Sequence, residues 1–176
     1  CGYKGHLIKE YFANYSLRQS DVTFNLVDNS VSIHQNKTEP WKITLVNTGE
    51  NTMTGGRLKL VKSYIKDEED FCFTYGDGVA AINITKLLKF HQNHGKQATL
   101  TAVRPPGRYG ALKLVSNDKV TNFKEKPEGD KSWINGGFFI LKPDVIDLIK
   151  DNNVSWELNP LNDLAINNQL YAFKHH

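Results

Sequence analysis

The sequence predicts an α/β fold, in which a mixed, mostly parallel sheet is flanked by helices and accompanied by a small antiparallel meander. A short apolar run at 71–75, a helical pattern from 83 and an extended segment at 98–103 form a strand–helix–strand unit, which implies parallel pairing. Three short extended segments in the first third of the chain predict the meander. With 176 residues, 39% of them hydrophobic, the chain can bury one core, so a single domain over residues 1–176 is expected.

The first third of the chain predicts a helix, the meander and a second helix. After Gly5, apolar residues at helical spacing predict a helix that packs one stripe against the core and ends near residue 20: Leu7, Ile8, Tyr11, Phe12 and Tyr15. Turn-forming residues then separate three extended segments, which are 22–27, 31–35 and 41–46. A helix over 56–65 follows, and the Thr54 hydroxyl is available to cap its amino end.

The rest of the chain predicts alternating strands and helices. Residues 71–75 fit a fully buried strand that ends at Gly76, and the helix after it has Asn83 as its N-cap and Gly95 at its end. The other expected elements are strands at 98–103, 111–115, 120–124 and 138–141, a helix from Pro143, a helix over 160–167 and a strand at 170–173. Open sheets bind ligands at the carboxyl ends of strands, so we expect chemistry in the loops after Tyr75, Val103 and Lys124.

The composition excludes several classes of function. Lys and Arg number 22 against 19 Asp and Glu, and these basic residues are dispersed, which argues against nucleic acid as a partner. The longest apolar run, 136–141, is far shorter than the roughly 18 residues of a membrane span, so no membrane association is expected. Only Cys1 and Cys72 occur, the latter as a reduced core position, which favours a cytoplasmic protein. Because the sequence opens on Cys1 and its one methionine is Met53, we expect an internal fragment, truncated at both ends.

Asp77 is the first candidate for chemistry, because it lies between two glycines at the end of a predicted strand. Flanking backbone without Cβ atoms would let a phosphate or a metal approach closely. A single carboxylate suits Mg²⁺, which takes one or two protein oxygens together with phosphates and waters. Asp-Gly after a strand is, however, more often a turn than a metal site.

Residues 52–57, Thr-Met-Thr-Gly-Gly-Arg, place two glycines and two hydroxyls at the amino end of a predicted helix. Free N–H groups and the helix dipole favour an anion at such a position. Arg57 adds a planar fork of donors, which suits a phosphate or the oxygen of a base. Plain capping of the helix gives the same sequence pattern.

Four further positions suggest a sugar phosphate. Residues 105–110, Pro-Pro-Gly-Arg-Tyr-Gly, form a stiff turn that offers a flat backbone surface to a sugar ring, or an ordinary loop. Glu125 suits hydroxyl hydrogens and Lys126 suits a phosphate, although alternating charges on an exposed strand end look the same. Asn135 beside two glycines indicates either a ligand wall or a bulge.

Histidine and cysteine chemistry have less support in the sequence. His91 and His94 are three residues apart in the last turn of a predicted helix, where a structural role is favoured over a shared metal. Cys72 has no basic neighbour that would lower its pKa, and no Ser/His/Asp arrangement stands out. Nucleophilic catalysis is therefore not expected.

Six short segments occur in an order that is specific, although each segment alone is weak. They are Cys1-Gly2-Tyr3-Lys4-Gly5, Thr54-Gly55-Gly56-Arg57-Leu58, Tyr75-Gly76-Asp77-Gly78-Val79, Pro105-Pro106-Gly107-Arg108-Tyr109-Gly110-Ala111-Leu112, Glu125-Lys126-Pro127 and Asn135-Gly136-Gly137-Phe138-Phe139. Together they resemble the sugar-1-phosphate nucleotidyltransferases, in the cytidylyltransferase form, over essentially the whole chain. The resemblance implies a nucleotide-diphospho-sugar transferase-like, Rossmann-related fold. It also implies transfer of a cytidylyl group from CTP to α-D-glucose 1-phosphate, which gives CDP-glucose and pyrophosphate for bacterial dideoxysugar and O-antigen biosynthesis.

The same resemblance implies roles for particular residues. Asp77 would be the ligand of Mg²⁺, and Gly76 would lie with it beside the α-phosphate of the nucleotide. Thr52 and Arg57 correspond to contacts with the cytidine nucleotide. The residues that correspond to the sugar-phosphate pocket are Gly110, Glu125, Lys126 and Asn135. Of these, Asp77 and Lys126 would be the catalytic residues, in a reaction that depends on positioning and charge neutralisation.

Parts of the family's pattern are not found in this sequence. The glycine-rich loop with its arginine and catalytic lysine would lie before Cys1, and a second metal-binding aspartate would lie beyond His176. We therefore expect the fragment itself to be inactive. Its parent is expected to be a homo-oligomer. The alternatives are a uridylyl-, thymidylyl- or guanylyltransferase of the same family, or a non-catalytic module that binds nucleotide sugars. The presence of Asp77, Glu125 and Lys126 together argues against the binding module, which needs no metal carboxylate.

Overall fold

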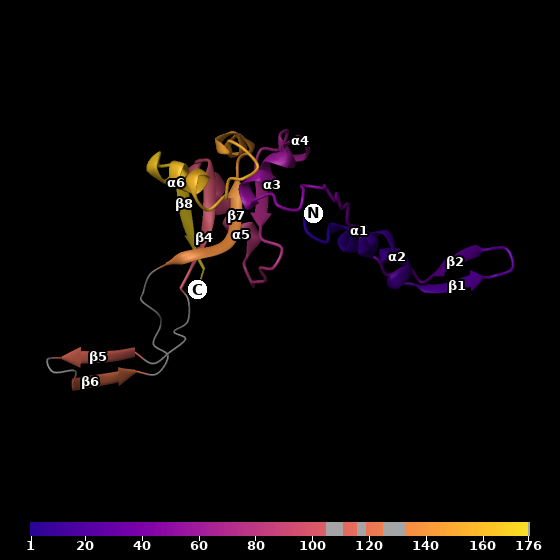
Figure 1. Cartoon of the computed structure of the whole chain (residues 1–176), viewed down its shortest axis with the longest axis horizontal. Helices are drawn as coiled ribbons and strands as arrows, with labels where there is room; N and C mark the ends of the chain where they lie inside the picture. Colours follow the sequence, from indigo (N-terminus) through magenta and orange to yellow (C-terminus); the bar gives the residue numbers. More distant parts are fainter. Residues whose placement is uncertain (105–110, 116–118, 125–132, 176) are drawn as a thin grey trace.

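A four-stranded sheet forms the centre of the computed structural model, which describes residues 1–104, 111–115, 119–124 and 133–175. Its strands lie in the order β3 (Phe71–Thr74), β7 (Ile134–Leu141), β4 (Ala98–Val103) and β8 (Leu170–Lys174). β7 runs antiparallel to both of its neighbours, whereas β4 and β8 pair in parallel. Three of these strands therefore share one direction, and the predicted mixed sheet is confirmed (Figure 1).

The predicted strand–helix–strand unit consists of β3, α5 (Ile84–His94) and β4. β3 and β4 point the same way because each is antiparallel to β7, but the predicted parallel pairing between them is wrong, since β7 lies between them. The Asn83 side chain accepts a hydrogen bond from the Lys86 N–H at 2.9 Å, and Gly95 ends the helix with a φ of 65°. Both boundary predictions are confirmed, because capping depends only on residues within about one turn.

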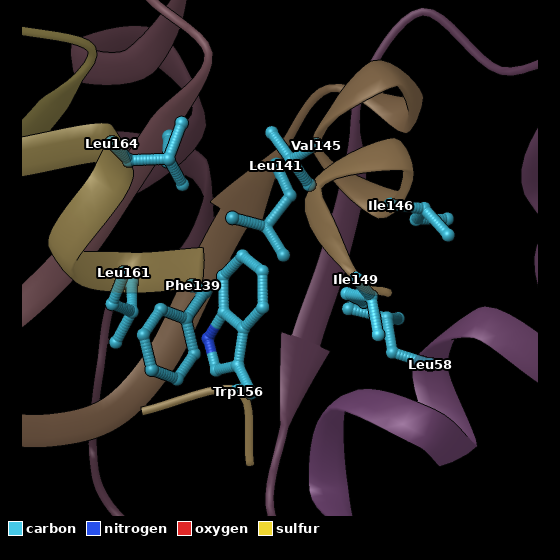
Figure 2. Close-up of a cluster of buried hydrophobic side chains, with 10 residues drawn as sticks. Leu58, Phe139, Leu141, Val145, Ile146, Ile149, Trp156, Leu161 and Leu164 are labelled. Carbon is cyan, nitrogen blue, oxygen red and sulfur yellow. The ribbon is translucent and has the colours of Figure 1, made fainter. Parts of the chain in front are cut away.

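The main core lies on one face of the sheet, beside α3 (Thr54–Leu60), the 3₁₀ helix η2 (Pro143–Leu148) and α6 (Asn159–Ile166). At its centre Trp156 and Phe139 are fully buried and meet edge to face, with ring centroids 6.1 Å apart (Figure 2). Leu141 joins this cluster, whereas Ile140 between them on β7 points to the opposite face, which α5 contacts. Each such side chain contributes roughly 1.5–3 kcal/mol on burial, so the segment around Trp156 is held firmly against the sheet.

β3 is less buried than the sequence predicts. Phe71 and Phe73 are half-buried and Cys72 is exposed, so the predictions of a fully buried strand and of Cys72 as a core position are wrong. The reason is that β3 is an edge strand: within the part of the chain that the structure describes, it pairs with β7 alone. A short apolar run does not distinguish an edge strand from a central one.

The first elements of the chain form an arm, residues 5–34, that extends away from the sheet (Figure 1). It consists of α1 (Gly5–Ala13), α2 (Tyr15–Arg18), β1 (Asp21–Asn25) and β2 (Ser30–His34). The predicted single helix is interrupted at Asn14, and its apolar stripe does not pack against the core, because Leu7, Ile8 and Tyr11 are exposed. Aromatic residues instead pack on one another. Trp41, for example, stacks on Tyr15 with ring centroids 5.9 Å apart.

The predicted meander is therefore a two-stranded hairpin, β1 and β2, because residues 41–46 form no strand. The helix expected over 56–65 is divided into α3 and α4 (Lys62–Ile65), and the helix expected from Pro143 is the 3₁₀ helix η2. β7 begins at Ile134, four residues before the strand predicted at 138–141. The strands predicted at 111–115 and 120–124 are β5 (Ala111–Val115) and β6 (Lys119–Lys124), which pair as an antiparallel hairpin. No helix in the described ranges is long and apolar enough to cross a membrane.

Candidate functional site

A cavity of about 530 Å³ opens where the end of β3 meets the start of α3. Its walls include Thr54 and Arg57 from α3, and Tyr75, Gly76 and Asp77, which follow β3. The structure thus brings the glycine-rich helix start and the Gly-Asp-Gly turn to one place. We take this cavity as the candidate site.

Asp77 lies in a turn directly after β3, and its side chain is exposed. The Gly78 N–H donates to the Tyr75 carbonyl at 3.3 Å, so the Asp-Gly turn that the sequence indicates is present. A Cβ added to Gly76 would meet no atom within 4 Å, which leaves open space next to the carboxylate. A carboxylate beside open space fits Mg²⁺, which needs few protein oxygens when phosphates supply the others. Among the described residues no group of three or more His, Cys, Asp or Glu side chains could hold a metal ion.

Arg57 forms hydrogen bonds within its own chain. Its guanidinium donates to the Thr48 hydroxyl at 2.7 Å, to the Gly49 carbonyl at 2.9 Å and to the Glu50 carbonyl at 3.0 Å. These bonds fix the loop that leads to Thr52, which is partly buried and is not among the residues that line the cavity. A guanidinium carries five N–H donors, so two are left for a ligand.

The glycines at the start of α3 serve close packing. A Cβ added to Gly56 would lie 2.4 Å from the Asn152 carbonyl oxygen, and one on Gly55 would lie 2.7 Å from that of Val154. The Gly56 N–H also donates to the Val154 carbonyl at 3.2 Å. The prediction that the Thr54 hydroxyl caps the helix is wrong. This hydroxyl accepts a hydrogen bond from the backbone N–H of Trp156 at 2.9 Å, so it joins the helix to the loop that also contains Asn152 and Val154.

Glu157 does not line the cavity but bonds to Thr54, which does, and the sequence analysis missed it. Its carboxylate accepts hydrogen bonds from the hydroxyls of Thr54 (2.8 Å) and Ser155. Burial acts to raise the pKa of Glu157, but the neighbouring hydroxyls of Ser155, Tyr75 and Thr54 outweigh it and hold the pKa below its usual value. Burial is the main cause that raises the pKa of Tyr75, and the neighbouring carboxylate of Glu157 is the second. No sequence signal points to Glu157, since its partner Thr54 on α3 lies 103 residues earlier in the chain.

Asn135 lies at the start of β7, next to the candidate site. Its amide nitrogen donates to the Tyr75 hydroxyl at 3.4 Å, and its amide oxygen accepts from the Gly137 N–H at 2.8 Å. Gly137 has a φ of 78°, and a Cβ there would lie 3.0 Å from the Tyr75 ring. The structure therefore places Asn135 beside the residue that precedes Gly76. The other predicted sugar-phosphate residues, Gly110, Glu125 and Lys126, lie outside the described residues.

His91 and His94 form a hydrogen-bonded network away from the candidate site. His91 contacts the hydroxyl of Thr99 at 2.8 Å and the carboxylate of Asp70 at 3.2 Å, and His94 contacts the same hydroxyl at 2.7 Å. The Lys96 N–H donates to the other ring nitrogen of His94 at 3.0 Å. These partners satisfy both rings within the fold, which supports the structural role expected for them.

Comparison with known proteins identifies the family. The model of the nucleotidyl transferase family matches residues 20–173. A glucose-1-phosphate cytidylyltransferase of Salmonella typhi is 56% identical over 99% of this chain, and a probable glucose-1-phosphate cytidylyltransferase of Bacillus subtilis is 40% identical over the same share. The chain belongs to the nucleotidyl transferase family, and its relatives in these two bacteria are enzymes named as cytidylyltransferases. It spans 68% of the length of each.

Solved structures agree on the fold. HddC from Yersinia pseudotuberculosis superposes with a TM-score of 0.62 at 20% identity, over 98% of this chain and 66% of that one. A putative glucose-1-phosphate thymidylyltransferase from Bacillus anthracis gives a TM-score of 0.51 over 76% of this chain and 58% of its own. These likenesses confirm the predicted nucleotidyltransferase-like α/β fold.

Proposed function

We propose that this chain carries the active site of an enzyme that transfers a cytidylyl group from CTP to α-D-glucose 1-phosphate, releasing pyrophosphate and CDP-glucose. The observation that carries the proposal is the cavity in which Arg57, Gly76 and Asp77 meet beside Asn135. The 56% identity to a glucose-1-phosphate cytidylyltransferase supports the choice of substrates. The reaction belongs in the cytoplasm and supplies an activated sugar for bacterial dideoxysugars, as in the O-antigen of lipopolysaccharide.

In this proposal Asp77 holds a divalent cation, Mg²⁺, and the open space at Gly76 admits the α-phosphate. A bound Mg²⁺ supplies positive charge where negative charge develops on the phosphate oxygens. Arg57 fixes the loop before α3, which carries Thr52, and its two remaining donors are available to the nucleotide. Asn135 lies on the sugar-phosphate side, where Gly110, Glu125 and Lys126 are proposed from the sequence alone.

The chemistry is an in-line displacement at the α-phosphorus of CTP. A phosphate oxygen of glucose 1-phosphate forms the new bond to this phosphorus, and the bond from phosphorus to the bridging oxygen of pyrophosphate breaks. No covalent intermediate with the protein is required. The residues of the chain therefore act by binding and orienting two anions, which is the main source of catalysis in such transfers.

The test is a comparison of nucleotides. The complete gene product that contains residues 1–176 is incubated with glucose 1-phosphate, MgCl₂ and, in separate assays, CTP, UTP, dTTP or GTP, and pyrophosphate and nucleotide sugar are measured. We expect CDP-glucose to form at the highest rate. A preference for another nucleotide would reassign the base. Binding of nucleotide sugar without turnover of any of the four would favour a non-catalytic module.

A further inference from the structure

Gly2 lies directly against the guanidinium of Arg57. A Cβ added to Gly2 would lie 2.1 Å from Nη1 of Arg57 and 2.5 Å from both Cζ and Nη2. Side chains do not approach one another so closely in folded proteins, so only a glycine leaves the guanidinium in this position. The Gly2 carbonyl accepts from the Gly5 N–H at 2.9 Å, and the start of α1 therefore holds the backbone on which the guanidinium rests.

Thr48 holds the same guanidinium through a hydrogen bond. Its side chain is buried, and both its N–H (2.8 Å) and its hydroxyl (3.0 Å) donate to the Cys1 carbonyl. Because the single hydrogen of the hydroxyl is used in this way, its oxygen is left to accept from Nη1 of Arg57, at 2.7 Å. The backbone of Cys1 and Gly2 thus fixes Thr48, and together they fix Arg57.

These contacts determine which donors of Arg57 remain. Nη1 uses its two hydrogens on Thr48 and Gly49, and Nη2 uses one on Glu50. The second hydrogen of Nη2 and the Nε–H are left. Since the guanidinium is planar and rigid, fixing Nη1 and Nη2 also fixes the directions of these two donors. Arg57 and Thr48 both line the cavity that contains Asp77.

We propose that Gly2 and Thr48 are positioning residues that hold the Arg57 guanidinium so that its two remaining N–H groups meet the nucleotide in the cavity. They act through Arg57. A glycine is required at position 2 because any larger residue would occupy the space of the guanidinium. This inference rests on the proposed function, which assigns the nucleotide to this cavity.

The first test is Gly2→Ala in the complete gene product. We expect it to weaken the binding of CTP, measured by calorimetry without glucose 1-phosphate, and to raise the KM for CTP by about 10- to 100-fold, because a displaced guanidinium no longer presents its donors. The KM for glucose 1-phosphate should stay within about twofold of the wild type. The melting temperature should hardly change, since the added methyl meets the flexible end of a side chain and not the backbone.

Thr48→Val removes the hydroxyl but keeps the shape of the side chain. It should weaken the binding of CTP by about 3- to 10-fold, as expected for the loss of one hydrogen bond. Thr48→Ser restores the hydroxyl and should restore the wild-type affinity. Thr23→Val is the matched control, because it removes a hydroxyl that bonds to His34 on the exposed hairpin, and it should bind CTP as the wild type does.

A double variant tests whether Gly2 acts through Arg57. Arg57→Ala should weaken the binding of CTP by itself, and it removes the side chain that a methyl on Gly2 would meet. Adding Gly2→Ala to Arg57→Ala should therefore cause no further loss. If Gly2→Ala caused the same loss with and without Arg57, or if it left the affinity for CTP unchanged, the inference would be overturned.

Nuclear magnetic resonance of the ¹⁵N-labelled protein separates this inference from the proposed function. The Nε–H signal of Arg57, identified by its loss in Arg57→Ala, should shift in Gly2→Ala and Thr48→Val but not in Thr48→Ser. An unchanged signal in Gly2→Ala would overturn the positioning role whether or not the protein uses CTP. A wild-type protein that bound no CTP would instead overturn the proposed function, and the signal would still show whether Gly2 and Thr48 hold Arg57.

Discussion

Two carboxylates near the candidate site differ in their burial and in their hydrogen-bond partners. Glu157 is surrounded by hydroxyl donors, which keep it charged although it is partly buried. Asp77 is exposed and directly follows Gly76, where an added Cβ would meet no atom within 4 Å. A carboxylate that is fully bonded has little capacity for a ligand, whereas an exposed one retains all of its lone pairs. This difference fits the proposal that Asp77 takes part in the chemistry of the site, and it favours a structural role for Glu157.

Asp77→Asn should therefore lower turnover by at least about 100-fold, because it removes the charge that would hold the cation at the transferred phosphate. The turn should survive, since asparagine is also favoured in turns, and the melting temperature should not change. Pyrophosphate release at saturating MgCl₂ is the measurement. Asp67→Asn, an exposed carboxylate before β3, is the control and should behave as the wild type. Near-normal turnover of the Asp77 variant would exclude the metal role.

The histidine network predicts a dependence of stability on pH. Burial is the main cause that lowers the pKa of both His91 and His94, and Lys142 acts in the same direction on each. Asp70 opposes this for His91, whereas Lys96 reinforces it for His94. Both rings are thus neutral in the folded state at pH values where the unfolded chain already binds protons. The stabilisation is complete above the unfolded pKa of about 6.5 and is lost as pH falls below it toward the folded pKa.

Urea unfolding at pH 7.5 and pH 5.5 measures this effect. The free energy of unfolding should fall between the two, and it should fall less in His94→Gln, which removes one of the two titrating groups. His34→Gln on the exposed hairpin serves as the control and should keep the wild-type difference. An equal difference in all three proteins would show that the network is not its source.

At the scale of elements, α3 and the turn after β3 use glycine for different reasons. Gly56 allows α3 to approach the Asn152 carbonyl, which is backbone and cannot rotate away. Gly76 faces open space and has no such neighbour. The first glycine therefore serves packing between an element and a loop, and the second leaves room for something that the chain itself does not provide.

This contrast gives a matched pair of variants. Gly56→Ala should destabilise the protein by about 1–3 kcal/mol, because the added methyl overlaps the Asn152 carbonyl. Gly76→Ala should change the free energy of unfolding by no more than about 0.5 kcal/mol while raising the KM for CTP. Thermal unfolding and steady-state rates of both variants are the measurements. If Gly76→Ala left the KM for CTP unchanged, the α-phosphate could not lie against this glycine.

At the scale of the whole molecule, the arm and the sheet differ in what holds them. The arm exposes large apolar side chains, with Val27 95% and Leu26 85% accessible, and a two-stranded hairpin has little stability of its own in water. β7 pairs on both sides, and Phe139, Ile140 and Leu141 are fully buried on it. The same chain thus contains a strongly held centre and a weakly held extension.

Hydrogen exchange should resolve this difference along the chain. Backbone amides of β1 and β2 should exchange within seconds to minutes, and those of β7 and β4 only through global unfolding. Mass spectrometry of peptic fragments is the measurement. Slow exchange throughout β1 and β2 in the complete gene product would contradict a free arm and would show that another surface covers it, as a second copy of the chain would in a homo-oligomer.

The sequence carries local information well and distant information poorly. The cap at Asn83 and the end of α5 at Gly95 were predictable, because their partners lie within a turn. The exposure of Leu7 and Ile8 was not, because helical spacing marks an apolar stripe without saying what covers it. For the site, Arg57 and Asp77 were recognised as candidates from their neighbours. Glu157 was not, since its role arises only when the fold brings Thr54 to it.

The insertion of β7 between β3 and β4 also has a consequence for the protein during its synthesis. Thr74 on β3 bonds to Gly137 on β7, 63 residues later in the chain. A ribosome needs roughly 3 to 13 seconds to add that length at about 5–20 residues per second. Until then β3, α5 and β4 have been synthesised in order, but the strand that joins β3 to β4 does not yet exist. The aromatic side chains of β3 therefore remain without their partners from β7 on the nascent chain during these seconds. Exposed apolar segments of this kind are prone to aggregate.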